Sequence, residues 1–103
     1  MGNGLERLEK LPRAVLAHTP TPIEHLPNLS VKIGGAVLYV KRDDCTGLAL
    51  GGNKARQLEY VFGEAKAAGA GAMVITGAVQ SNFVRMATAG AAKLGMECHV
   101  QLE

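Results

Sequence analysis

The stretch AMVITGAVQSNFVRMATAGAAKLGMECHVQL, residues 72–102, decides the fold class of this chain. Its first apolar run, Ala72–Thr76, predicts a buried strand, and Gly77–Ser81 predicts a turn. Asn82 is a good N-cap for the helix that follows, and Gly95 ends that helix. The apolar side chains of the helix recur every three or four residues, at Val84, Ala87, Ala91 and Leu94. A last strand has alternating apolar side chains at Cys98, Val100 and Leu102.

A strand, a helix and a strand in this order predict two parallel strands joined by a right-handed crossover. The preceding residues add a helix over Asn53–Ala68, with Gly69 as its C-terminal stop. The apolar side chains of this helix form one stripe, at Ala55, Leu58, Phe62 and Ala65. Because parallel strands are buried on both faces, we expect an α/β fold with an open, mostly parallel sheet and helices on both faces.

The first half of the chain is expected to be less regular. Residues 1–28 should be extended, because each proline of Thr19–Pro22 and of Leu26-Pro27 biases the residue before it away from the helix. Ala36–Lys41 predicts a short strand. Four charges then stand together at Lys41–Asp44, where we favour a solvated, self-paired turn over a pair of acid/base carboxylates.

Composition excludes several classes of protein. With 103 residues, of which 48% are hydrophobic and 19% charged, the chain has the size and balance of one small globular domain. The 11 basic residues are scattered among 9 acidic ones, which argues against nucleic-acid binding. Two cysteines far apart, Cys45 and Cys98, fit a reducing compartment. No stretch has the pattern of a signal peptide or a membrane span, so we expect a soluble, cytoplasmic chain.

Lys54 is the first candidate for chemistry. It follows Gly51, Gly52 and Asn53, at the end of a flexible loop predicted over Gly47–Gly52. The helix dipole is positive at this end and disfavours a cation by roughly 0.3–1 kcal/mol, which favours the neutral, nucleophilic amine. A Schiff-base lysine and a surface lysine both remain open, and placement alone favours the surface lysine.

Two phosphate-binding motifs fail at this loop. A P-loop requires Gly-Lys followed by Ser or Thr, whereas Asn53 separates Gly52 from Lys54. A dinucleotide fingerprint requires glycines after the strand, whereas Gly69-Ala70-Gly71 precedes one. A small nucleotide-binding module is therefore the weakest of the functions considered.

Gln80, Ser81 and Asn82 form the second candidate site. They stand at the carboxyl end of a predicted parallel strand and the start of a helix, where open α/β sheets bind ligands. The amide groups there suit a carboxylate or a phenolic oxygen, and ordinary helix capping explains the same residues equally well. No metal site is expected, because the histidines and cysteines lack ligand spacing. Arg85 is expected to form a surface or interface ion pair rather than to bind substrate. The other polar residues are assigned to packing or surface roles: His18, His25, His99 and Tyr60.

Four segments occur in the order Thr21–Pro27, Lys41–Asp44, Gly51–Glu59 and Gln80–Asn82. Together they resemble the family of D-cysteine desulfhydrase and 1-aminocyclopropane-1-carboxylate deaminase, which are fold-type II pyridoxal-phosphate enzymes. The resemblance runs from about residue 11 to the end of the chain. Each segment alone is weak evidence for the family. The four segments in this order are strong evidence, and they favour the Schiff-base interpretation of Lys54 over the surface interpretation.

The resemblance implies roles for five residues. Lys54 would hold the cofactor as a Schiff base and move the substrate α-proton, and Asn53 would support the pocket beside it. Asn82 would hydrogen-bond the ring oxygen of the cofactor and contact the substrate. Ser81, as a catalytic residue, and Gln80 would bind the substrate and its carboxylate. Pyridoxal 5′-phosphate would supply the electron sink, and the complete enzyme would be a homodimer.

The implied reaction converts a small β-substituted amino acid to a 2-oxo acid and ammonia, with D-cysteine as the first expectation and sulfide as its leaving group. L-cysteate sulfo-lyase and 1-aminocyclopropane-1-carboxylate deaminase are alternatives, because Phe83 stands where the desulfhydrases often have histidine. A non-catalytic, truncated remnant is a further alternative.

Family members are considerably longer, so the chain is expected to be an N-terminal portion. Residues 1–50 would be a lead-in and a strand of the larger cofactor domain, and residues 51–103 the truncated start of the smaller α/β domain. The glycine-rich phosphate loop and the partner of the pyridine nitrogen would lie downstream. We therefore expect these 103 residues alone to be inactive.

Overall fold

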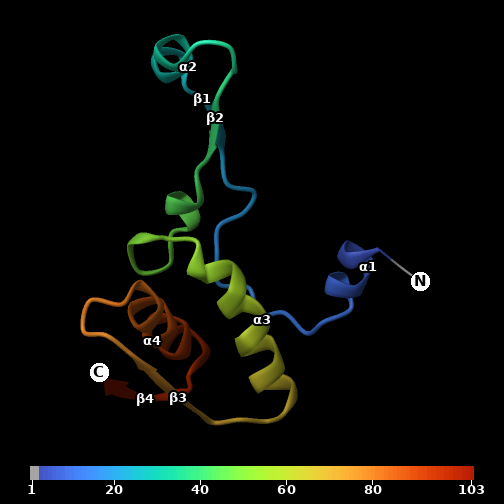
Figure 1. The fold of residues 1–103 in the computed structure, drawn as a ribbon. Coiled ribbons are helices and arrows are strands. Elements are labelled where there is room, and N and C mark those ends of the chain that lie inside the picture. Colours follow the sequence, from blue (N-terminus) through green and yellow to red (C-terminus); the bar gives the residue numbers. More distant parts are fainter. Residues whose placement is uncertain (1–2) are drawn as a thin grey trace.

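A computed structural model describes residues 3–103, which form a packed body and a protruding arm (Figure 1). The body contains α3 (Lys54–Ala67), β3 (Ala72–Gly77), α4 (Asn82–Leu94) and β4 (Glu97–Leu102). The arm contains β1 (Ile23–His25), α2 (Pro27–Ile33) and β2 (Tyr39–Lys41). Two 3₁₀ turns, η1 (Asp43–Thr46) and η2 (Leu48–Leu50), connect the arm to the body, and α1 (Gly4–Glu9) lies to one side.

β3 and β4 are parallel, as the strand–helix–strand pattern predicts. Their register runs from Ala72 opposite Glu97 to Gly77 opposite Leu102. α4 packs on the face that carries the buried Ile75, and α3 packs against α4. The opposite face of the pair is open within residues 3–103, since Val74 is 79% exposed, whereas the sequence predicts burial on both faces. The α/β class and the parallel pairing are confirmed.

The hydrophobic core lies between the two long helices, along the apolar stripes that their sequences predict. Leu58 and Phe62 of α3 and Met86 of α4 are fully buried. Gly90 allows the helices to approach closely, because a Cβ atom there would lie 2.8 Å from Cε2 of Phe62. The N-terminal segment, residues 11–17, completes the core by burying Leu16.

The first half of the chain is more regular than the sequence predicts. α1 is capped by Asn3, whose Oδ1 accepts a hydrogen bond of 2.9 Å from the Glu6 amide. Pro27 begins α2 rather than breaking a helix, because the first helical position needs no amide donor. β1 pairs antiparallel with β2, which is shorter than the predicted strand over Ala36–Lys41.

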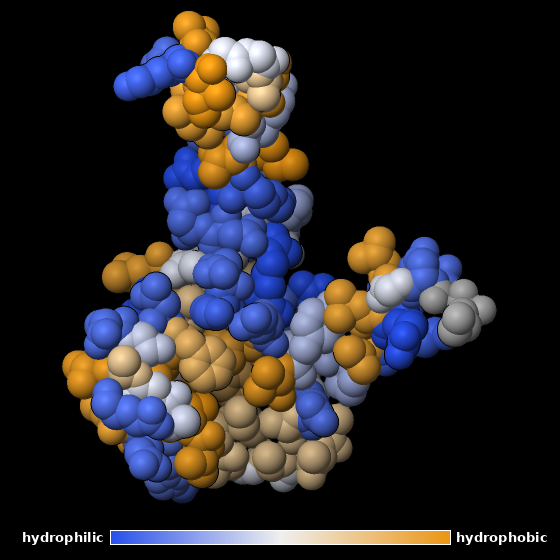
Figure 2. All heavy atoms as spheres, in the orientation of Figure 1, coloured by the Kyte–Doolittle hydropathy of each residue, from blue (hydrophilic) through white to orange (hydrophobic). Residues whose placement is uncertain are grey.

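The arm presents apolar side chains to solvent. Figure 2 shows these gathered near the tip of the arm, with a hydrophilic zone between the arm and the body. The exposed apolar residues of this region are Ile23, Leu29, Val31, Ile33 and Val37.

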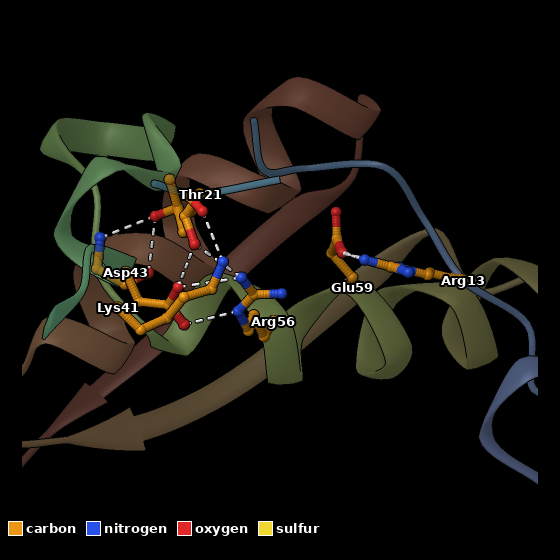
Figure 3. A network of polar contacts seen from close by, with 8 residues as sticks. Arg13, Thr21, Lys41, Asp43, Arg56 and Glu59 are labelled. Carbon is orange, nitrogen blue, oxygen red and sulfur yellow. Dashed lines mark hydrogen bonds and ion pairs between the residues drawn. The ribbon is translucent and has the colours of Figure 1, made fainter. Parts of the chain in front are cut away.

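A buried carboxylate attaches the N-terminal segment to α3. Oε1 of Glu59 accepts a hydrogen bond of 2.8 Å from Arg13 Nε (Figure 3). Oε2 accepts bonds of 2.8 and 3.0 Å from the amides of Leu16 and Ala17. Burial raises the pKa of Glu59, but the two amides and the guanidinium more than offset it, so the pKa lies below its ordinary value. The carboxylate therefore stays charged and fully bonded inside the body.

A second network joins the base of the arm to α3 (Figure 3). Arg56 Nε donates to Asp43 Oδ2 at 2.6 Å, and the Thr21 hydroxyl donates to Asp43 Oδ1 at 2.7 Å. Lys41 Nζ donates to the Thr21 carbonyl at 2.6 Å. The hydrogen bonds from Arg56 and then Thr21 lower the pKa of Asp43 to about 2. Three segments of the chain meet at this carboxylate.

The charged turn over Lys41–Asp44 is self-paired only in part. Arg42 contacts Asp44 at 2.7 Å and also Glu24 at 2.9 Å, as a solvated turn would. Asp43 instead reaches across to α3. Both aspartates are thus engaged by guanidinium groups, which argues against acid/base roles for this pair.

Replacing Glu59 with glutamine should destabilise the fold, because one amide cannot accept all four hydrogen bonds that this carboxylate receives. We expect the free energy of unfolding in urea to fall by roughly 1–3 kcal/mol, the cost of leaving buried donors unpaired. The matched control Glu64→Gln changes an exposed carboxyl on the same helix and should cost less than about 0.5 kcal/mol. Equal effects of the two variants would contradict this role.

The stability should depend on pH in the acid range. With a pKa of about 2 against an ordinary 3.8, folded Asp43 binds a proton less readily than it does in the unfolded chain. Its contribution is present above pH 3.8 and is lost as the pH falls towards 2. We expect the urea midpoint to drop across this range, and Asp43→Asn to weaken the drop. If the urea midpoint of Asp43→Asn fell as steeply with pH as that of the wild-type protein, Asp43 would be ruled out as the cause.

Candidate active site

Lys54 is the first residue of α3 and is half-buried. The helix therefore begins one residue later than the sequence predicts, and it ends one residue earlier, at Ala67. Asn53 precedes the helix in a right-handed conformation with an exposed side chain. The lysine thus sits at the positive end of the helix dipole, where the sequence analysis places it.

The two glycines before Lys54 are required by the local backbone. Gly51 and Gly52 have φ values of +83° and +141°, which L side chains rarely adopt. A Cβ atom at Gly51 would lie 2.0 Å from the carbonyl oxygen of Asp44, and one at Gly52 would lie 3.0 Å from Sδ of Met86. The glycines therefore let this loop run directly against η1 and α4.

Thr46 holds this loop by a pair of hydrogen bonds. Its fully buried hydroxyl donates to the Gly52 carbonyl at 2.7 Å and accepts from the Gly52 amide at 2.9 Å. The segment predicted as a flexible loop contains the 3₁₀ turn η2 and is held at its end by this side chain. Sequence reasoning did not identify Thr46, because a single threonine six residues before a glycine carries no recognisable pattern.

The polar turn Gln80–Asn82 lies where β3 ends and α4 begins, as predicted. Ser81, rather than Asn82, is the N-cap, and its Oγ accepts a hydrogen bond of 3.2 Å from the Val84 amide. Asn82 is the first helical residue and is exposed, as is Gln80. The N-cap therefore lies one residue before the predicted Asn82, because Ser81 has the extended backbone that an N-cap needs.

Arg85 brings the two candidate segments together. Its Nη1 donates to the Ala49 carbonyl, and its Nη2 donates to the Gly51 carbonyl at 3.2 Å and to Asn82 Oδ1 at 3.4 Å. The expected surface ion pair is therefore wrong, because this guanidinium bonds neutral oxygens from two elements. The loop before Lys54 consequently lies against the N-terminal turn of α4.

The candidate groups are of the kinds that bind an anionic ligand and attack an electrophilic carbon. They comprise one primary amine, one hydroxyl and uncharged amides, next to two glycines without side chains. Two cavities of about 370 and 410 Å³ are both lined by Leu11, and the candidate residues line neither of them. Asn53, Gln80 and Asn82 are exposed, so within residues 3–103 the candidate site lies open to solvent.

Other kinds of site are not found in the described part of the chain. Residues 3–103 contain no cluster of three potential metal ligands. Their helices are all too short or too polar to cross a bilayer. Cys45 and Cys98 are both free.

Comparison with known proteins identifies the family. Residues 15–103 match the family model described as pyridoxal-phosphate dependent enzyme. A 1-aminocyclopropane-1-carboxylate deaminase of Rhizobium leguminosarum is 57% identical over 95 residues, covering 90% of this chain and 28% of the relative. A D-cysteine desulfhydrase of Klebsiella pneumoniae is 48% identical over 99 residues, covering 96% of this chain and 30% of the relative.

A solved structure supports the same assignment. The crystal structure of an ACC deaminase homologue superimposes with a TM-score of 0.88 at 45% identity, covering 99% of this chain and 31% of that one. The chain thus spans less than a third of the length of the relatives it matches. The fold and the sequence agree that this chain belongs to the pyridoxal-phosphate dependent enzyme family, with relatives named as 1-aminocyclopropane-1-carboxylate deaminase and D-cysteine desulfhydrase.

Proposed function

We propose that the complete protein carrying this sequence uses pyridoxal phosphate to deaminate a small amino acid, with Lys54 as the amine that holds the cofactor. One observation carries the proposal. Lys54 opens α3 one residue after two positive-φ glycines, and Arg85 joins that loop to Asn82 at the start of α4. The loop that leads to the amine therefore lies against the start of the helix that carries the uncharged hydrogen-bonding groups.

The residues present fit this cofactor. A primary amine is the group that condenses with an aldehyde, and Lys54 offers one, half-buried at the start of a helix. Asn82 accepts from Arg85 through Oδ1, which leaves its Nδ2–H groups to donate to a phenolic oxygen. When bound, the cofactor supplies an electron sink for the substrate α-carbon.

The remaining candidates bind the substrate. The Ser81 hydroxyl accepts from the Val84 amide, so its own proton can be donated to a carboxylate oxygen. The amides of the first turn of α4 add a favourable field for that anion. Gln80, exposed in the same turn, would face the substrate, and Asn53, exposed next to Lys54, would support the cofactor.

Proton transfer to and from the substrate carbons is assigned to Lys54. With D-cysteine this amine would accept the α-proton, whereas 1-aminocyclopropane-1-carboxylate has no α-hydrogen, so with that substrate the amine would move a proton at a ring carbon. Ser81 would orient the substrate for this step by holding the carboxylate, so that the reacting carbon faces Lys54.

The relatives named as 1-aminocyclopropane-1-carboxylate deaminase and as D-cysteine desulfhydrase both have small amino acids in their names as substrates. The sequence favours D-cysteine, whereas the relative named as 1-aminocyclopropane-1-carboxylate deaminase has the higher identity, 57% against 48%. Phe83 also departs from the histidine expected of desulfhydrases. We therefore propose 1-aminocyclopropane-1-carboxylate as the better substrate and D-cysteine as the alternative.

The role of Lys54 is tested by borohydride reduction of the complete protein loaded with pyridoxal phosphate, followed by peptide mapping. We expect the label on Lys54 and loss of the visible absorption of the bound cofactor in Lys54→Ala. The control Lys66→Ala, at the exposed end of the same helix, should keep both signals. A label on another lysine would refute the assignment.

The substrate is tested by measuring ammonia and 2-oxo acid release from 1-aminocyclopropane-1-carboxylate, D-cysteine and L-cysteate, with sulfide measured in parallel. We expect kcat/KM to be highest for 1-aminocyclopropane-1-carboxylate, and to fall at least about a hundredfold in Ser81→Ala if the hydroxyl orients the substrate. A higher kcat/KM for D-cysteine, with sulfide release, would reverse the proposed preference. Ammonia release from none of the three would overturn the reaction itself.

A further inference from the structure

The loop before Lys54 contains a strained segment. Ala49 and Leu50 have φ values of +46° and +73°, in the left-handed region that residues with a Cβ atom adopt at a cost. Leu50 is 93% exposed, so its side chain is not what holds this conformation. Such a segment persists only where other contacts determine the backbone.

The contacts that determine it come from Arg85. Its guanidinium bonds the carbonyls of Ala49 and Gly51, which are the residues on either side of Leu50. A planar guanidinium directs several N–H groups from one rigid fork, so one side chain can hold both carbonyls. The Thr46 hydroxyl holds the next residue of the loop.

The same guanidinium also reaches α4. Its Nη2 contacts Asn82 Oδ1 at 3.4 Å, one turn earlier on the helix that carries Arg85. This contact sets which end of the Asn82 amide faces away from the guanidinium. Arg85 therefore contacts both candidate segments, and its Nη1 and Nη2 groups donate to protein oxygens.

We propose that Arg85 is a positioning residue that braces the strained Ala49–Gly51 segment and orients the Asn82 amide, and thereby sets Lys54 and Asn82 relative to each other. It acts through these residues and does not itself touch the substrate. The link to the cofactor rests on the proposed function, whereas the bracing of the loop does not.

The brace is tested first without cofactor, by hydrogen exchange of the complete protein. The Gly51 and Gly52 amides donate to the Leu48 carbonyl and the Thr46 hydroxyl, so both should exchange slowly. We expect Arg85→Ala to accelerate their exchange by roughly 10- to 100-fold, and Arg85→Lys, with a single ammonium, to have a smaller effect. The control Lys93→Ala, in the last turn of α4, should leave these amides unchanged.

The effect on the site is tested by titrating pyridoxal phosphate. We expect its Kd to rise by roughly 10- to 100-fold in Arg85→Ala and less in Arg85→Lys, with the Lys54 label retained at saturation. Wild-type exchange rates in Arg85→Ala would overturn the brace, and faster exchange with an unchanged Kd would overturn its link to the cofactor. If Arg85→Ala does not fold, Arg85→Lys replaces it. Wild-type exchange rates in Arg85→Lys would then overturn the brace, and a wild-type Kd would overturn its link to the cofactor. A wild-type protein that does not bind the cofactor would defeat the proposed function, while the exchange test of the brace would still stand.

Discussion

The structure depends on one buried carboxylate. Glu59 lies in the middle of α3, and its two oxygens accept hydrogen bonds from a guanidinium and from two backbone amides of the N-terminal segment. Leu16 and Ala17 are buried next to this helix, so their amides would lose hydrogen bonds to water without gaining others if the carboxylate were absent. The carboxylate thus pairs two buried amides, which lets an otherwise irregular segment complete the core.

The first turn of α3 also joins distant parts of the chain. Arg56, one turn before Glu59, bonds Asp43 and thereby joins the base of the arm to the helix that Lys54 begins. The loop before that helix is held from two further sides, by Thr46 and by Arg85. The start of α3 is consequently held by side chains from three other segments, Asp43, Thr46 and Arg85. The cofactor role proposed for Lys54 would require such a fixed geometry.

Family membership and the open geometry of the site fit together. The chain covers less than a third of its relatives, and within residues 3–103 one face of the β3–β4 pair is exposed. The candidate residues lie at the starts of two helices, where amide groups and dipoles favour anionic groups. In the proposed function, Lys54 and the Gln80–Asn82 turn would supply groups on one side of the ligand.

The amino-acid sequence by itself determined the helices and strands of residues 53–102, their parallel pairing and the family, because apolar periodicity and the order of short motifs are local properties. It located Lys54 and the Gln80–Asn82 turn for the same reason. Only the tertiary structure decided the partners of Glu59, Asp43 and Arg85, because these side chains bond groups 13 to 46 residues away. Such contacts depend on how the helices pack, and no spacing in the sequence encodes them.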